Sequence, residues 1–162
     1  AVAGDFEEKS LVPALTRWLA RLPRGSAPAK PAPHAPARAA AHRVARECQQ
    51  ALVFDAFPGP GALHADDTAA TVLHEILSGM SARLFERVRE EKGLAYFVGA
   101  SRVLGVADGM FYLYAGTQPG KEDEVLGEFD AELARLAAGR IEPAELARAV
   151  TRIQASRRMR LQ

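Results

Sequence analysis

The chain has 162 residues, of which 48% are hydrophobic and 25% are charged, a balance typical of a globular protein with a buried core. Its 21 basic and 20 acidic residues give a formal net charge of +1, so the overall charge selects neither nucleic acid, nor a membrane surface, nor an acidic ligand. No apolar run approaches the length of about eighteen residues that a membrane span needs. The single cysteine, Cys48, excludes an internal disulfide and is predicted to be a small buried hydrophobe.

The first residues, AVAGD, are typical of the end of a strand that enters a turn, so we expect the chain to be part of a longer polypeptide. Five apolar residues follow at helical spacing and predict a helix that begins near Ser10: Leu11, Leu15, Trp18, Leu19 and Leu22. Pro13 lies in the first turn of this helix, where a proline costs little.

Residues 23–42 combine five prolines with small residues and have no apolar periodicity, which predicts an extended linker between two domains. A proline-rich peptide ligand is the alternative. His34 and His42 lie in this stretch without a second metal ligand at a useful spacing, so both are predicted to be solvated.

From residue 43 onward the pattern alternates between β and helical segments. The predicted segments are a β stretch from Arg43 to Phe57, a helix capped by Asp66 or Asp67 and ended by Gly79, a helix from Ser81 to Glu91 ended by Gly93, a hairpin of residues 94–104 and 109–117 with Asp-Gly in its turn, a helix from Lys121 to Gly139 and a helix from Pro143 to Gln162. This order predicts an α+β fold of two layers, a mainly antiparallel sheet with helices packed on one face.

The chain lacks the spacing of a zinc hydrolase motif. His74-Glu75 would need a histidine at position 78 to give H-E-x-x-H, and that residue is Ser78. The inverted motif, H-x-x-E-H, is also absent from the sequence. We therefore predict no metal site and no catalytic residue in this chain, and we expect that the chain alone does not cleave anything.

Two charged helices suggest surface roles. On the helix from Ser81 to Glu91, acids and bases alternate in a pattern typical of an exposed face paired within itself: Arg83, Glu86, Arg87, Arg89, Glu90, Glu91 and Lys92. The last helix is rich in arginine, which either complements the dipole of its C-terminal end or forms a nucleic-acid-binding face: Arg148, Arg152, Arg157, Arg158 and Arg160. The first interpretation is favoured because no exposed aromatics are interleaved with these arginines.

The stretch REEKGLAY places Arg89 and Tyr96 seven positions apart across a Lys-Gly turn, although neither residue is needed to make that turn. In one interpretation Arg89 is a surface residue and Tyr96 a sheet residue. In the other, the two side chains converge on a ligand, because a guanidinium and a phenol both donate hydrogen bonds to carbonyl oxygens.

The order of VAGDF, LARLP, a linker, LVFDAFPGP, LHEILSGMSARLFERVREEKGLAY and GMFYLYAGTQP resembles the insulinase/pitrilysin family of zinc metallopeptidases, which includes the mitochondrial processing peptidases. The likeness covers nearly the whole chain and is most specific from Ile76 to Tyr96. The resemblance implies that residues 1–22 end a catalytic lobe, that 23–42 link two lobes, and that 43–162 begin a second, non-catalytic and here incomplete lobe.

In that family the first lobe binds zinc through H-x-x-E-H, and the second contributes an Arg and a Tyr that contact the backbone of a bound peptide. The resemblance therefore implies substrate binding by Arg89 and Tyr96, zinc in a separate catalytic lobe of the same chain or of a partner subunit, and cleavage of peptides or unfolded polypeptide by the assembled protein. It also implies a bacterial cytoplasmic or periplasmic location and leaves a homo-oligomer possible.

Two alternatives remain open at this point. Relatives of this kind include structural or regulatory subunits that keep the lobe and have lost the chemistry, and in such a protein Arg89 and Tyr96 would be vestigial. The second alternative is an unrelated α+β module that binds nucleic acid through its arginine-rich last helix.

Overall fold

The computed structural model describes residues 2–26, 29 and 38–160, and it divides into two units, Ala1–Lys30 and Pro31–Gln162. The first unit holds one helix, α1 (Glu8–Leu19), whose residues are all at least partly exposed. This helix begins two residues before the predicted Ser10 and contains Pro13 within it. The central part of the predicted linker, including His34, lies outside the described residues, so the predicted lobe boundaries stay predictions.

The second unit contains a three-stranded sheet in the order β1-β3-β2, with antiparallel pairing throughout. The strands are β1 (Ala51–Pro60), β2 (Ala95–Leu104) and β3 (Asp108–Thr117). The β2–β3 hairpin is as predicted, but its turn is Gly105 to Ala107, and Asp108 and Gly109 already belong to β3. The predicted antiparallel pair is confirmed.

Strand β1 lies eight residues further along the chain than the predicted start at Arg43, and it continues through Pro58 to Pro60. A proline cannot donate to a ladder and is tolerated where one side of the strand has no partner, as at this edge of the described sheet. Residues 38–48 form no regular structure, and Cys48 is exposed, so the prediction of a buried thiol is wrong.

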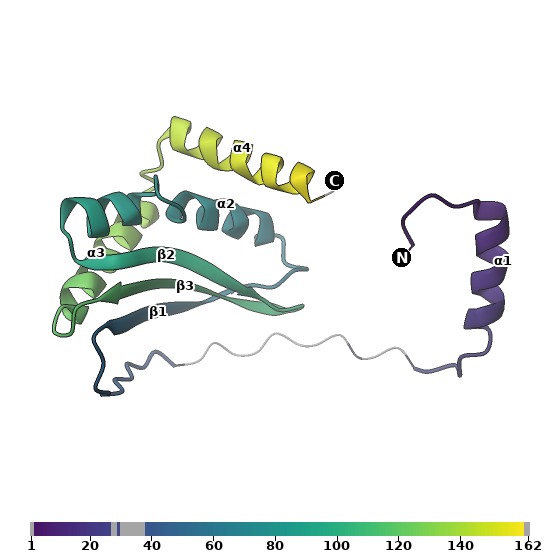
Figure 1. Ribbon diagram of the computed structural model, residues 1–162, viewed down its shortest axis with the longest axis horizontal. Helices are drawn as coiled ribbons and strands as arrows, with labels where there is room; N and C mark the ends of the chain where they lie inside the picture. Colours follow the sequence, from purple (N-terminus) through teal and green to yellow (C-terminus); the bar gives the residue numbers. More distant parts are fainter. Residues whose placement is uncertain (1, 27–28, 30–37, 161–162) are drawn as a thin grey trace. The chain divides into compact units, whose positions relative to one another are not determined.

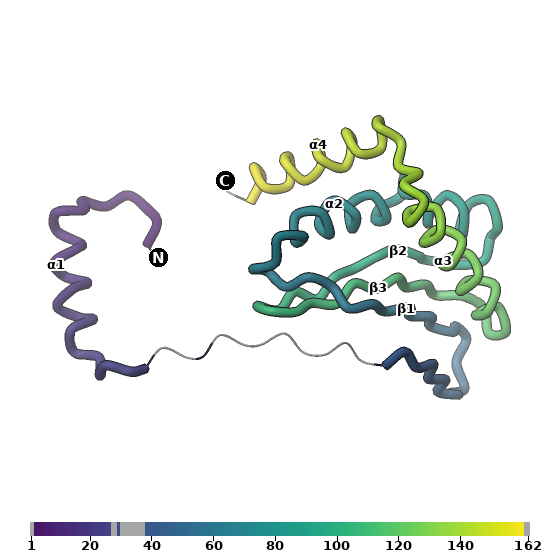
Figure 2. Tube along the Cα trace, turned by 180° about the vertical axis from the view of Figure 1, so that it is seen from behind, coloured from purple at the N-terminus to yellow at the C-terminus, as the bar shows by residue number. Residues whose placement is uncertain are grey.

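Four helices of the second unit lie on one side of the sheet (Figures 1 and 2). They are α2 (Asp67–Leu77), η1 (Phe85–Glu91), α3 (Glu122–Ala137) and α4 (Pro143–Met159). Helix α2 lies between the sheet and α4, so α4 forms an outer layer over α2. The predicted α+β fold, a mainly antiparallel sheet with helices on one face, is confirmed.

Alternate residues of the strands and the inner faces of the helices form one apolar core. Its buried members include Val53, Leu77, Leu84, Val88, Val98, Leu113, Val125 and Phe129. Val88 on η1 and Val98 on β2 belong to this core, so the helix end and strand start on either side of residues 92–94 are both anchored by packing. In the described residues no helix combines the length and apolar character that a membrane crossing requires.

The helix ends follow most of the predicted signals. Gly79 (φ +99°) and Gly93 (φ +60°) adopt the positive φ values that a glycine accepts most readily, just after α2 and η1 respectively. The predicted cap of α2 is wrong in its chemistry: Asp66 occupies the N-cap position without a side-chain cap bond, and the carboxylate of Asp67 instead lies 2.6 Å from Arg102 on β2.

Candidate functional site

The segment that carries Arg89 is a π-helix, in which each N–H bonds five residues back instead of four. Helix η1 spans Phe85–Glu91, and the N–H of Lys92 donates to the carbonyl of Arg87 over 3.2 Å. Such segments are rare and occur frequently at functional sites. The prediction of a regular helix over Ser81 to Glu91 is therefore corrected: residues 83–84 are α-helical and the wider π-helix follows.

Arg89 lies near the end of η1 with its side chain 45% exposed. Its guanidinium carbon is 4.8 Å from the centre of the Phe85 ring, a cation–π contact with the preceding turn. Its Nε atom is 3.7 Å from a carboxylate oxygen of Glu90, which is an ion-pair distance but too long for a hydrogen bond. The guanidinium thus keeps donors available to an added acceptor.

A tight turn connects η1 to β2. Gly93 takes a left-handed conformation, and the N–H of Leu94 donates to the carbonyl of Val88 over 2.9 Å, which ties the start of the strand to the helix. Ala95 then pairs with Thr117 on β3. The turn that separates Arg89 from Tyr96 is consequently held at both of its ends.

Tyr96 occupies a β-bulge. Ala95 pairs with Thr117 and Phe97 pairs with the next residue, Gly116, so Tyr96 is the extra residue of β2. Tyr96 is 49% exposed, and the side-chain Nε2 atom of Gln118 lies 3.5 Å from the hydroxyl oxygen of Tyr96. A bulge changes the direction of a side chain relative to a regular strand, and it explains why Tyr96 and its neighbour Phe97 are both exposed.

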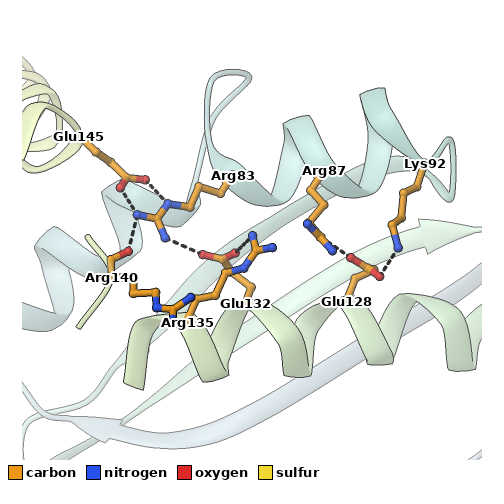
Figure 3. Close-up of polar contacts among 8 residues, drawn as sticks. All are labelled: Arg83, Arg87, Lys92, Glu128, Glu132, Arg135, Arg140 and Glu145. Atoms are coloured by element: carbon orange, nitrogen blue, oxygen red, sulfur yellow. Dashed lines mark hydrogen bonds and ion pairs between the residues drawn. The ribbon is translucent and has the colours of Figure 1, made fainter. Parts of the chain in front are cut away.

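Two charge clusters connect this region to other helices (Figure 3). The inner charge cluster consists of Arg83, Glu132, Arg135, Glu145 and the carbonyl of Arg140. Arg83 donates to Glu145 over 2.7 Å, to Glu132 over 3.2 Å and to the Arg140 carbonyl over 2.7 Å. Glu145 and then Glu132 raise the pKa of Arg83, so this guanidinium stays charged while it joins three segments.

The outer charge cluster consists of Arg87, Lys92 and Glu128. One carboxylate on α3 accepts from the Nε of Arg87 and from the Nζ of Lys92, each over 2.5 Å, and Figure 3 shows both cations converging on it. The hydrogen bond from Lys92 is the main cause of a lowered pKa for Glu128, with Arg87 adding to it. The outer charge cluster thus holds the C-terminal part of η1 against α3.

These contacts correct the prediction that the charges of residues 81–92 pair within their own helix. Arg83, Arg87 and Lys92 pair with carboxylates of α3 and α4, and the pair between Arg89 and Glu90 is the local one among the described contacts. The π-helix explains part of this. Arg87 and Lys92 are five residues apart. In an α-helix such residues point about 140° away from each other, whereas the wider turn of a π-helix brings them towards one face.

The histidine and arginines singled out from the sequence lie elsewhere. Burial is the main cause of a lowered pKa for His74 on α2. Arg152 on α4 lies 3.0 Å from the carboxylate of Glu75, so it serves the packing of α4 on α2. Across the described residues no group of three His, Cys, Asp or Glu side chains could hold a metal ion, and zinc therefore has no fitting site in this part of the chain.

The fold and these contacts define a helix-backed antiparallel α+β domain. The profile of the family described as "Peptidase M16 inactive domain" matches residues 1–153. The chain therefore belongs to the peptidase M16 inactive-domain family, which confirms the resemblance to insulinase/pitrilysin-type zinc metallopeptidases.

Several bacterial relatives are named zinc proteases. An uncharacterized zinc protease of Streptomyces coelicolor is 39% identical over 115 residues, covering 70% of this chain and 25% of that protein. An uncharacterized zinc protease of Mycobacterium leprae is 32% identical over 151 residues, covering 90% of this chain and 34% of that protein. The chain thus spans a quarter to a third of these two relatives.

Solved structures agree in fold. The peptidase M16 inactive domain from Pseudomonas fluorescens has a TM-score of 0.81 at 24% identity, covering 94% of this chain and 38% of that one. A protease from Helicobacter pylori has a TM-score of 0.58 at 28% identity, covering 66% of this chain and 26% of that one. The first of these likenesses supports the arrangement of strands and helices in the second unit.

Glu128 was missed by the sequence analysis. It lies 41 residues from Arg87 and 36 from Lys92, and in the sequence it is one of several acids on an amphipathic helix. Only the packing of α3 beside η1 distinguishes it from its neighbours. Arg89 and Tyr96 were singled out because their types and spacing match the Arg and Tyr of the resembled family.

Proposed function

We propose that this chain supplies the substrate-contacting, non-catalytic lobe of a zinc-dependent endopeptidase, with Arg89 and Tyr96 donating hydrogen bonds to backbone carbonyls of a bound peptide or unfolded polypeptide. The observation that carries the proposal is that both side chains are about half exposed on either side of one anchored turn. A core position would have buried the donors of either side chain, and the contact of Arg89 with Glu90 is too long to occupy a donor.

The chemistry of the pair suits recognition of a polypeptide backbone. A guanidinium offers several N–H donors in a fixed plane and a phenol offers one O–H, and both address carbonyl oxygens without reading side chains. Helix η1 and strand β2 are tied together by the Leu94–Val88 hydrogen bond and by the core, so the two donors rest on anchored elements. Anchored donors lose less entropy on binding than donors on a loop.

The proposal assigns the remaining parts of the polypeptide to two lobes. Residues 1–22 end the catalytic lobe, residues 23–42 link the lobes and residues 43–162 begin the non-catalytic lobe. The zinc belongs to a lobe with H-x-x-E-H, in the same polypeptide or in a partner subunit, and when bound it supplies the Lewis acid that activates water. We call this chain together with that lobe the assembled protein.

The test uses the assembled protein, an unstructured reporter peptide and two substitutions. Arg89→Ala and Tyr96→Phe are each expected to lower kcat/KM by about a hundredfold, the loss typical of one hydrogen-bond donor that supports a reacting carbonyl. Zinc content should stay unchanged. Matched controls are Arg148→Ala, an exposed arginine on α4, and Tyr112→Phe, a tyrosine of β3, which should both retain full activity.

Unchanged turnover in both Arg89→Ala and Tyr96→Phe would remove the assigned role. A wild-type assembled protein that binds the peptide without cleaving it would favour the structural or regulatory alternative. Binding can be followed separately by fluorescence anisotropy after a chelator has removed the metal. A loss of peptide affinity in Arg89→Ala under those conditions would support substrate contact without reference to catalysis.

A further inference from the structure

Side chains of α3 and β3 restrain the turn between Arg89 and Tyr96 from outside: Glu128 on α3 pairs with two cations, and the hydroxyl of Thr117 on β3 donates to the carbonyl of Leu94. Glu128 on α3 accepts from Arg87, two residues before Arg89, and from Lys92, the residue that precedes the Gly93 turn. These two bonds bracket Arg89 along the chain, although Arg89 itself does not take part in them. The carboxylate is therefore placed to fix the end of η1 on which the candidate donor stands.

We propose that Glu128 is a positioning residue for the Arg89–Tyr96 pair. This inference rests on the proposed function. Glu128 sets the orientation of the last turn of the π-helix by accepting one charged hydrogen bond at each end of it, and it thereby aims the guanidinium of Arg89 and the start of β2 at the same peptide.

The burial of the three groups supports this assignment. The side chain of Glu128 is only 12% exposed, whereas that of Lys92 is 42% exposed, so a nearly buried acceptor holds two partly solvated cations. Water can rehydrate the partly solvated cations when the carboxylate is changed, so we expect this cluster to contribute less to global stability than a fully buried one. A carboxylate with two donors in this setting chiefly restricts local geometry.

The chemistry of the carboxylate also explains why a glutamate stands here. An ionised carboxylate has two acceptor oxygens, one for Arg87 and one for Lys92. A glutamine of the same shape offers one acceptor oxygen and an NH₂ group that would face the other cation. Glu128→Gln should therefore release one end of the turn while the packing of α3 is retained. Glu128→Asp keeps both acceptors on a shorter stem.

The experiment measures kcat, KM and peptide affinity in the assembled protein. Glu128→Gln is expected to lower kcat/KM about tenfold and to weaken binding of a fluorescein-labelled unstructured peptide to the metal-free protein. Glu128→Asp should recover to within about threefold of wild type. The matched control is Glu124→Gln, the same change one turn earlier on α3, where the carboxylate pairs with Lys121 of its own segment. It should behave as wild type.

A double-mutant cycle separates positioning from general destabilisation. If Glu128 acts through the pair, then adding Glu128→Gln to the Arg89→Ala/Tyr96→Phe variant should reduce kcat/KM by less than about twofold further. A full additional tenfold loss would show that Glu128 acts independently of the pair and would overturn the inference.

The two proposals fail in different ways. If Arg89→Ala and Tyr96→Phe leave turnover and binding unchanged, the proposed function fails and the inference fails with it. If those two variants are impaired while Glu128→Gln equals Glu124→Gln, only the positioning role is overturned. Equal losses in Glu128→Gln and Glu128→Asp would also contradict it, because the carboxylate chemistry would then be irrelevant.

Discussion

The two charge clusters along η1 differ in how deeply their charges are buried. We expect the inner charge cluster to stabilise the fold and the outer charge cluster to orient the candidate site. In the inner charge cluster Glu132 is 1% exposed and Arg83 links three segments of the chain. In the outer charge cluster Glu128 is 12% exposed and its partners Arg87 and Lys92 are 32% and 42% exposed, compared with 21% for Arg83. Buried charges leave a large penalty when one partner is removed, whereas solvated charges are rehydrated.

The largest effect should come from breaking the inner charge cluster. Glu132→Ala removes a buried acceptor from Arg83 and Arg135, although Arg83 keeps Glu145 and the Arg140 carbonyl, and it should reduce the free energy of unfolding by about 1–3 kcal/mol. Urea denaturation of the chain measures this loss. Glu128→Ala, measured alongside, should cost several times less. Equal losses for the two variants would erase the distinction between the clusters.

A second test strains the turn without touching either cluster. Gly93→Ala introduces a Cβ at φ +60°, where no neighbouring atom lies within 4 Å of it, so the cost is backbone strain alone. We expect a loss of about 1–2 kcal/mol in unfolding free energy. The same variant should lower peptide affinity, because the turn sets the relation of Arg89 to Tyr96. A variant with native affinity would indicate that the turn geometry is unimportant for binding.

Raising the salt concentration should change the stability contributions of the two clusters by different, smaller amounts. Raising the ionic strength from 0.15 M to 1 M shortens the screening length from about 8 Å to about 3 Å, which weakens exposed ion pairs more than buried ones. The difference in unfolding free energy between wild type and Glu128→Gln should therefore shrink in 1 M NaCl, whereas that between wild type and Glu132→Gln should change little. The opposite pattern would assign the structural role to the outer charge cluster.

The smallest effect is a dependence on pH with opposite signs at two carboxylates. Lys92 lowers the pKa of Glu128 below its usual 4.5. The stabilisation that the ionised Glu128 gives is therefore complete above pH 4.5 and is lost as the pH falls through the lowered pKa. Asp55, on β1, has a pKa raised above its usual 3.8 by burial, with a contribution from Asp130. The protein is therefore not destabilised by this carboxyl below pH 3.8 and loses stability as the pH rises through the raised pKa.

The two signs give a paired measurement. The stability difference between Glu128→Gln and wild type should close in acid, whereas the gain from Asp55→Asn should appear only as the pH rises above 3.8. Urea denaturation at a series of pH values from 3 to 7 records both. A parallel change in the two variants would contradict the causes assigned to the pKa shifts.

The sequence by itself determined the order of elements, the α+β class, the hairpin and the family. The elements and the class follow from local signals: apolar periodicity along each helix, β-type segments on either side of Asp-Gly, and the stops at Gly79, Gly93 and Gly139, which adopt positive φ in the structure. The family follows from the resemblance of the ordered motifs. The sequence also singled out Arg89 and Tyr96, whose assigned role is still a prediction. It began β1 eight residues too early, and it ended the strand three residues too early because the prolines that suggested its end are tolerated at an edge.

The tertiary structure alone decided how that candidate site is built. The π-helix, the bulge at Tyr96 and the pairing of Arg87 and Lys92 with Glu128 depend on α3 and β3, which follow more than ten residues later in the chain. Local pattern ranks residue types along one element, whereas packing chooses which of several equivalent acids meets a cation on another. The sequence predicted that the charged residues of this helix pair with one another. In the packed structure, Arg83, Arg87 and Lys92 instead pair with carboxylates of α3 and α4.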